Sequence, residues 1–254
     1  GRLAARIAGE SWETAARFLL RSPAILDRIG MNGLAMVGDF AELLARESWA
    51  AAVQLLDRCP AIIDGLQAQG DPERITRLCH LGSRIALYNA RLAVSLLERS
   101  PEIMARIGFE GLERLESLAH DLGADSWTTA VSLLETSPAI LDRIGMDGLA
   151  SIAAVARAVA RENSYGAVSL LEKSPHLLDR LLQHGDRELA LRIYGFAGEA
   201  AALNWRLAAT LLEESPGLLS RLGASGLERL LKIVPRAAQG NGAVAKRLLD
   251  VSPA

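Results

Sequence analysis

Apolar residues recur along this chain at intervals of three and four, the spacing that places them on one face of an α-helix. In the segment SWTTAVSLLET, for example, Trp127, Ala130, Leu133 and Leu134 fall on one helical stripe. Similar segments follow one another along the whole chain, joined by connections of two or three residues. Connections this short place neighbouring helices antiparallel or at sharp angles. The pattern predicts an all-α protein.

The helical pattern is itself repeated. A Ser-Pro step, with Cys59 once in place of serine, recurs at spacings of 37 or 41 residues. Its prolines are Pro23, Pro60, Pro101, Pro138, Pro175, Pro216 and Pro253. Eleven residues before each Ser or Cys stands a typical helix N-cap residue: Ser11, Ser48, Asn89, Ser126, Asn163, Asn204 and Asn241. Internal repeats of this length are typical of solenoid proteins.

Small residues mark the same positions in every repeat. Four residues after each cap stands an alanine: Ala15, Ala52, Ala93, Ala130, Ala167, Ala208 and Ala245. Each complete repeat also carries a glycine further on: Gly33, Gly70, Gly111, Gly148, Gly185 and Gly226. An invariant alanine in an apolar stripe predicts that two helix axes approach closely there.

These markers divide the chain into six complete repeats: 11–47, 48–88, 89–125, 126–162, 163–203 and 204–240. Residues 1–10 match the end of a preceding repeat, and 241–254 form a partial one. The sequence SPAILDRIGMNGLA at Ser22 reappears as SPAILDRIGMDGLA at Ser137, an offset of 115. The block 11–125 is therefore interpreted as duplicated in 126–240. Each long repeat has four extra residues, about one helical turn of 3.6 residues.

Each repeat is predicted to contain three helices. The first runs from the cap to the Ser-Pro step, because a residue before proline disfavours the α conformation. The second is short and begins at the proline, with the serine as its cap; in four of the six repeats it ends at a glycine. The third, called helix C below, follows the second glycine.

Three helices in roughly 40 residues, with a short one in the middle, resemble armadillo and HEAT-like repeats over the whole chain. The resemblance implies one right-handed α-solenoid over 1–254, in which stacked repeats share a continuous core. The unit S-W-x-x-A-x-x-L-L-x-x-S-P also resembles helical regions of bacterial von Willebrand A–type proteins that work with AAA ATPases.

Composition narrows the possible functions. Half of the residues are hydrophobic, and the formal net charge of −2 does not favour a nucleic-acid partner. The two cysteines make no disulfide framework, and no stretch is long enough for a membrane span. The first residues lack the apolar core of a signal peptide, so a cytoplasmic protein is expected. Neither end carries a polar capping repeat; we expect the native protein to continue on both sides and uncapped ends to allow self-association.

Nothing in the sequence predicts catalysis, a metal or a cofactor. His80, His120, His176 and His184 fall in no metal-ligand spacing, and no phosphate-binding or nucleophile motif occurs. Cys59 stands at a predicted helix start, a position that can lower a thiol pKa. A lone thiol without a base is nevertheless usually inert. The expectation is a protein that is not an enzyme.

Two columns of charged residues and one of aromatic residues recur at fixed positions. The first column is an acid shortly before the Ser-Pro step: Asp57, Glu98, Glu135, Glu172, Glu213 and Asp250, with Leu20 breaking the run. These acids could form a negative stripe that binds a basic partner. We favour the alternative, that each is a solvated acid stabilised by the helix dipole at a helix start. The second column is an Asp-Arg pair: Asp27-Arg28, Asp142-Arg143 and Asp179-Arg180, with Arg106 and Arg221 keeping only the base. We expect these residues to form an acid–base ladder between repeats. The alternative is a row of arginines that binds a partner. Tryptophans follow the caps, and each is expected to pack on a neighbouring repeat rather than form a stacking row: Trp12, Trp49, Trp127 and Trp205.

Helix C varies most between repeats, so specificity is expected there. By analogy with armadillo-like folds, helix C lines the concave face and its basic residues are predicted to contact a protein or peptide partner. These are Arg74, Arg77, Arg84, Arg114, Arg157, Arg192 and Lys232. The sequence thus favours a protein-binding scaffold. The alternatives are an RNA-binding solenoid and the regulatory arm of an enzyme whose catalytic domain lies outside this chain.

Overall fold

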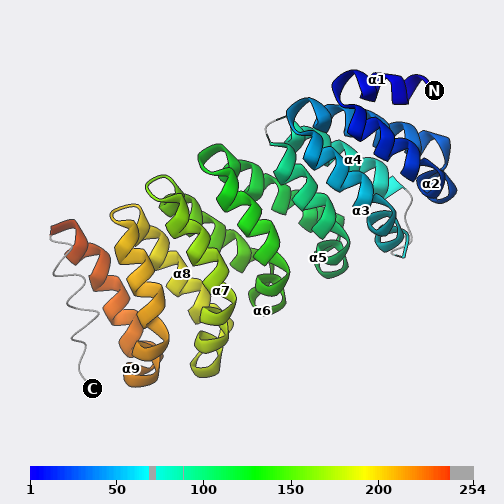
Figure 1. Cartoon of the computed structure of the whole chain (residues 1–254). Helices are drawn as coiled ribbons and strands as arrows, with labels where there is room; N and C mark the ends of the chain where they lie inside the picture. Colours follow the sequence, from blue (N-terminus) through cyan, green and yellow to red (C-terminus); the bar gives the residue numbers. More distant parts are fainter. Residues whose placement is uncertain (69–72, 88, 241–254) are drawn as a thin grey trace. The chain divides into compact units, whose positions relative to one another are not determined.

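A computed structural model describes residues 1–68, 73–87 and 89–240, with side chains described for all of these except 73–74 and 235–240. Every regular element in these ranges is helical, which confirms the all-α prediction. The helices are α1 (Arg2–Glu10), α2 (Trp12–Glu47), α3 (Trp49–Gln67), α4 (Glu73–Ala86), α5 (Ala90–Asp125), α6 (Trp127–Ala160), α7 (Ser164–His184), α8 (Arg187–Ala201) and α9 (Trp205–Gly240) (Figure 1).

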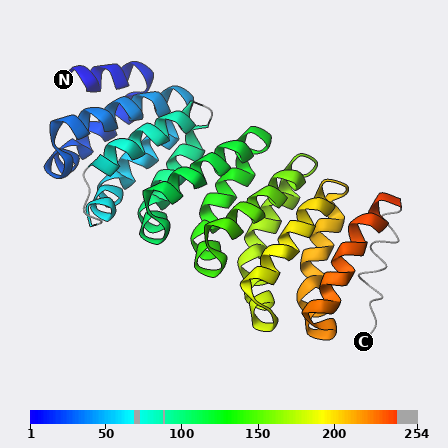
Figure 2. The same cartoon turned by 180° about the vertical axis from the view of Figure 1, so that it is seen from behind.

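The chain divides into two compact units, Gly1–His120 and Asp121–Ala254. Their boundary lies inside α5, close to the boundary at residue 125 predicted between the two blocks of repeats. In the first unit α2 packs against α1, α3 and α4. In the second unit α6 packs against α7 and α8, and α9 packs against the same two helices; Figure 2 shows these helices from behind.

The predicted N-caps are confirmed in all six complete repeats. Each cap side chain accepts a hydrogen bond from the backbone N–H three residues later, and each cap carbonyl accepts the first bond of the helix. The caps are Ser11, Ser48, Asn89, Ser126, Asn163 and Asn204. Asn241 lies outside the described residues.

The apolar stripes form the core of each unit. Leu133 and Leu134 are fully buried, as the spacing of apolar residues predicted. The alanines that follow the caps are buried as well: Ala15, Ala52, Ala93, Ala130, Ala167 and Ala208. A methyl group is the largest side chain that lets two helices come close, so these positions fit the close approach inferred from the sequence. Ala245 lies outside the described residues.

The prediction that each Ser-Pro step ends a helix is wrong at the six steps that the structure describes; Pro253 lies outside the described residues. The helix continues through Pro23, Pro60, Pro101, Pro138 and Pro175, and Pro216 likewise lies within α9. The first two predicted helices of each repeat are therefore one helix. Apolar residues on both sides of the proline, such as Phe18 and Ile25, are buried in the same core. That shared burial outweighs the local preference of the residue before proline for an extended conformation.

The serine of the Ser-Pro step is correspondingly not a cap for a following helix, because its hydroxyl donates backward. Proline has no N–H, so the carbonyl four residues before it loses its usual donor. Ser137 Oγ donates to the Leu134 carbonyl at 2.9 Å, and Leu134 is the residue four before Pro138. Ser100 does the same for Leu97, before Pro101. Ser22, Ser174 and Ser215 donate instead to the carbonyl four residues before themselves.

Glycine ends the proline-containing helix in four repeats, as predicted. Gly30, Gly108, Gly145 and Gly223 have φ between 63° and 68°, a left-handed conformation that strains any other residue. The next helical segment starts directly afterwards, so the second glycine lies inside helix C rather than before it. At Gly33, Gly111 and Gly148 a β-carbon would collide with the isoleucine side chain four residues earlier, and Gly226 stands likewise against Leu222. Gly185 caps α7, and Gly70 lies outside the described residues.

Candidate functional site

The basic residues of helix C, predicted to contact a partner, lie in varied surroundings. Arg77 places its guanidinium 5.3 Å from the ring centre of Phe109, a cation–π contact. Arg114 and Lys232 are exposed. The side chain of Arg74 lies outside the described residues. These positions do not converge on one pocket among the described residues.

Three of the predicted partner-binding arginines instead pair with acids on another helix. Arg157 lies 2.8 Å from Asp125 and 3.5 Å from Asp121, and it holds the pKa of Asp125 below its usual range. Arg192 pairs with Glu228 at 3.0 Å, and Arg84 with Glu116 at 3.4 Å. Burial of Glu116 raises the pKa of its carboxyl group despite this arginine. These three arginines join consecutive helix C segments.

The Asp-Arg column forms an acid–base ladder, which is the interpretation favoured from the sequence. Arg28 of α2 donates two hydrogen bonds to Asp64 of α3, at 2.6 and 3.0 Å. Arg143 of α6 binds Asp179 of α7 in the same way. The hydrogen bonds from arginine lower the pKa of both aspartates. Sequence reasoning missed Asp64, although it stands 37 residues after Asp27 and could have been found by aligning the repeats.

The acidic column forms a second ladder, which neither sequence interpretation anticipated. Arg21 binds Asp57 at 2.8 Å and Lys173 binds Glu213 at 2.7 Å. Glu98 accepts a hydrogen bond from Gln54, with Arg58 at 3.8 Å. The favoured interpretation of an acid at a helix start is wrong for the described members of the column, because no helix starts at the Ser-Pro steps that the structure describes. Glu135 and Glu172 are exposed, and Asp250 lies outside the described residues.

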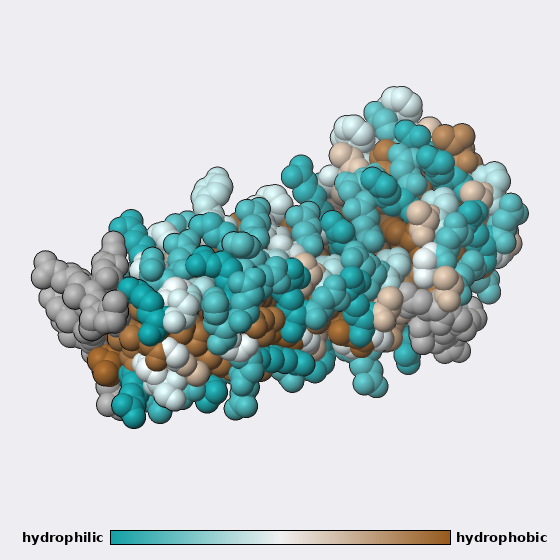
Figure 3. All heavy atoms as spheres, turned by 90° about the horizontal axis from the view of Figure 1, so that it is seen from below, coloured by the Kyte–Doolittle hydropathy of each residue, from teal (hydrophilic) through white to brown (hydrophobic). Residues whose placement is uncertain are grey.

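The tryptophans differ in how far they are covered. Trp12 is 70% exposed and Trp49 is 55% exposed, so more than half of the surface of each residue stays in solvent. Trp127 is 43% exposed. On the face shown in Figure 3, hydrophilic side chains predominate and apolar side chains are visible between them. Trp205 is the best covered of the four and lies against α7.

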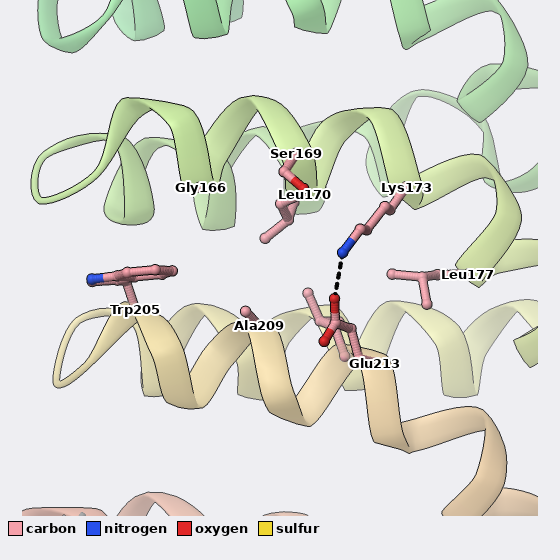
Figure 4. Close-up of a pocket in the computed structure, with 9 residues that line it drawn as sticks. Gly166, Ser169, Leu170, Lys173, Leu177, Trp205, Ala209 and Glu213 are labelled. Carbon is pink, nitrogen blue, oxygen red and sulfur yellow. Dashed lines mark hydrogen bonds and ion pairs between the residues drawn. The ribbon is translucent and has the colours of Figure 1, made fainter.

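A groove of about 250 Å³ opens beside Trp205, between α7 and α9 of the second unit (Figure 4). Its walls are mainly apolar; the indole ring lies at one end, the Lys173–Glu213 ion pair bridges α7 and α9 towards the other, and Leu177 lies just beyond the pair. The residues that line it are Gly166, Ser169, Leu170, Lys173 and Leu177 from α7, and Trp205, Ala209, Leu212 and Glu213 from α9. It combines an aromatic surface, an aliphatic floor of largely buried leucines and two opposite charges that are exposed to solvent.

Small side chains on α7 and α9 create this space. The duplicated block offers a direct comparison, since the residues 115 positions earlier occupy the corresponding places on α3 and α5. There Gln54 stands for Ser169 and Val94 for Ala209. The Gln54 amide reaches across to Glu98 at 2.9 Å. In the second block the shorter Ser169 leaves that path open.

Two further substitutions relative to the first block shape the aromatic end of the groove. Trp205 replaces Ala90, and Gly166 replaces Ala51. A β-carbon on Gly166 would lie 3.2 Å from Cζ3 of Trp205, so the glycine lets the ring lie close to α7. Sequence reasoning noticed Trp205 but not the small residues opposite it, because their effect depends on which helix faces them.

Potential metal ligands and cysteine thiols are two kinds of reactive group among the described residues. No cluster of three or more potential metal ligands occurs among them. Burial raises the pKa of the Cys59 thiol to about 12 and that of Cys79 to about 11. The suggestion that Cys59 has a lowered pKa is therefore wrong, because the thiol lies within a continuous helix and is buried rather than at a helix start. None of the described helices has the length and apolar character needed to span a membrane.

Comparison of the chain with family models, curated proteins and solved structures finds no match.

Proposed function

We propose that this chain is a non-catalytic helical-repeat scaffold that binds a polypeptide segment of a partner protein. The observation that carries the proposal is the groove between α7 and α9, with Trp205 at one end and the Lys173–Glu213 pair at the other. Binding surfaces between proteins concentrate their energy in tryptophan, tyrosine and arginine side chains at small apolar pockets. The groove places one such side chain, Trp205, beside an apolar floor.

The size of the groove favours a peptide side chain over a free small molecule. Sites that enclose drug-sized ligands or cofactors measure about 300–1,000 Å³ and cover most of the ligand. The groove measures about 250 Å³ and is partly open to solvent. It therefore suits one or two anchoring side chains of a segment whose backbone stays outside.

The regular ion-pair ladders support the architectural part of the proposal, an α-solenoid of the right-handed armadillo or HEAT-like kind. Arg28–Asp64 and Arg143–Asp179 join helices of successive repeats with the same spacing in both units. In such an array each repeat packs on its neighbours, and the grooves between repeats provide the binding surface. We propose that the scaffold acts in the cytoplasm.

An RNA ligand fits the groove less well. Single-stranded RNA binders combine stacking aromatics with a positively charged path along the phosphates. Here the charged residues beside the aliphatic floor are Lys173 and Glu213, which neutralise each other. A polypeptide is the occupant that this balance favours.

A selection from a random peptide library tests the proposal. The double variant Ser169→Gln/Ala209→Val fills the groove with the residues of the first block, which the same helix pair accommodates there. We expect peptides enriched on the native chain to lose binding to this variant. A matched control, Arg77→Glu/Lys232→Glu, changes exposed helix C positions away from the groove. Peptides that ignore the groove variant but are lost with the control would place the binding surface on helix C instead.

A further inference from the structure

The ion-paired end of the groove carries an excess negative charge. Glu214 follows Glu213 at the end where Lys173 supplies one positive charge, and Glu214 is exposed and has no ion pair within the described part of the chain. In the first block the corresponding position holds Arg99, which lines a pocket with Arg58 and Glu98 that does not reach Gln54 or Val94. The change from arginine to glutamate reverses the charge at this position between the two blocks.

Glu213 is also accessible to an incoming cation. The side chains of Lys173 and Glu213 are 56% and 49% exposed. Exposed pairs of this kind contribute little, about 0–1 kcal/mol, because water and salt screen them. A basic side chain of a partner can therefore bind Glu213 and Glu214 without the loss of a strong internal contact.

The aromatic end has the opposite character. The guanidinium of Arg206 lies 5.5 Å from the ring centre of Trp205, so a positive charge already occupies this end. A second cation arriving there meets repulsion from Arg206. The charge therefore changes along the groove: it is positive beside the indole ring, the middle is apolar, and it is negative beyond Glu213.

The spacing of these features sets the spacing in the ligand. Trp205 and Glu213 are separated by about 12 Å along α9, at about 1.5 Å per residue. An extended polypeptide advances about 3.3 Å per residue, so about three or four residues span this distance. The matching segment carries a large apolar side chain for the indole end and a basic side chain about three or four positions away.

We propose that the partner segment is an extended peptide with an apolar anchor at one end and a lysine or arginine at the other, the latter held by Glu213 and Glu214. The inference rests on the proposed function and adds the chemistry and direction of the bound segment. A segment with the charge reversed, or with basic residues at both ends, is disfavoured by Glu214 at one end and Arg206 at the other.

Titration calorimetry with four synthetic peptides tests this inference on the whole chain. The first has a leucine and an arginine separated by three intervening alanines. The others replace the arginine by glutamate, replace the leucine by serine, or add a second arginine beside the leucine. We expect the first peptide to bind most tightly and to weaken as salt is added. Each of the other three should bind more weakly, by up to about fivefold, the size expected for an exposed charge pair.

Two variants separate the inference from the proposed function. Glu214→Arg restores the residue of the first block and is expected to remove the preference for arginine over glutamate. Ser169→Gln is expected to weaken every peptide that binds. If Ser169→Gln abolishes peptide binding but arginine and glutamate peptides bind equally to the native chain, the groove is a peptide site and the charge assignment is wrong. If neither the four peptides nor library-selected ones respond to Ser169→Gln, both proposals are wrong. Binding of single-stranded RNA that Ser169→Gln weakens would also overturn both.

Discussion

Arg143 donates hydrogen bonds to both carboxylate oxygens of Asp179, at 2.6 Å from Nε and 2.8 Å from Nη2. Arg28 and Asp64 make the same paired contact in the other block. A planar guanidinium that meets a carboxylate in this way fixes the orientation of both groups. The two pairs thus define the register between a helix of one repeat and the corresponding helix of the next, in each unit independently.

The stability of the second unit should depend on pH through Asp179. Its pKa is lowered by Arg143 in the folded state, so the pair stabilises the fold above the ordinary range of an aspartate. That contribution is lost as the pH falls through the lowered pKa. We expect Asp179→Asn to reduce Tm slightly at neutral pH, with the difference from the native chain vanishing in acid. Asp27→Asn is the matched control, because Asp27 occupies the same repeat position and no hydrogen bond to it is seen in the described structure. Equal effects of the two variants would contradict the ladder.

The effects of substituting Ser137 and Pro138 on the free energy of unfolding should not be additive. Ser137 supplies the hydrogen bond that Pro138 cannot give to the Leu134 carbonyl. Ser137→Ala is expected to cost about 1 kcal/mol of unfolding free energy, and less when Pro138→Ala has restored a backbone donor. Urea unfolding of the single and double variants measures the difference. The same single and double variants of Ser174 and Pro175 are the control. Ser174 donates to the Leu170 carbonyl and not to that of Leu171, the residue four before Pro175. Coupling of the same size at both steps would contradict the assigned role.

Substitution by alanine should change the free energy of unfolding in opposite directions at Gly30 and Gly195. Neither has an atom within 4 Å of an added β-carbon, so packing does not distinguish them. Gly30 has φ +67°, where alanine costs about 1–2 kcal/mol. Gly195 lies inside α8, where alanine gains about 0.5–1 kcal/mol over glycine. Chemical unfolding of the two variants checks the signs, and stabilisation by Gly30→Ala would show that the chain does not turn there.

The two cysteines should resist alkylation while the protein is folded. Burial raises their thiol pKa values to about 12 and about 11, so almost no thiolate is present at neutral pH. Iodoacetamide followed by mass spectrometry should modify neither residue in the native protein and both in denaturant. Rapid native labelling of Cys59 would contradict its burial.

Much of the local structure could be predicted because it depends on neighbours in the sequence. Ser126 and Asn163 are caps by their own side-chain chemistry, and the alanines that follow them are buried as the apolar stripe requires. The turn at Gly145 was likewise visible as a glycine that ends an apolar run.

What could not be predicted depends on partners from other helices. The helix continues through Pro138 because Leu134 and Leu141, on either side of it, are buried together. The interpretation of Glu213 failed for a similar reason, since its partner Lys173 lies on α7. The groove is lined by Ser169 from α7 and Ala209 from α9, a relationship that neither residue reveals alone. Alignment of the two blocks would have shown both positions as departures from Gln54 and Val94.

The indole N–H signals in a nitrogen–proton NMR spectrum test the central claim most directly. The chain has four tryptophans, and each gives a separate indole signal that is assigned by substitution with phenylalanine. During titration with a library-selected peptide, the Trp205 signal should shift progressively and saturate, while the signals of Trp12, Trp49 and Trp127 stay in place. A peptide that binds the chain but leaves the Trp205 signal unmoved would contradict the claim that polypeptides bind between α7 and α9.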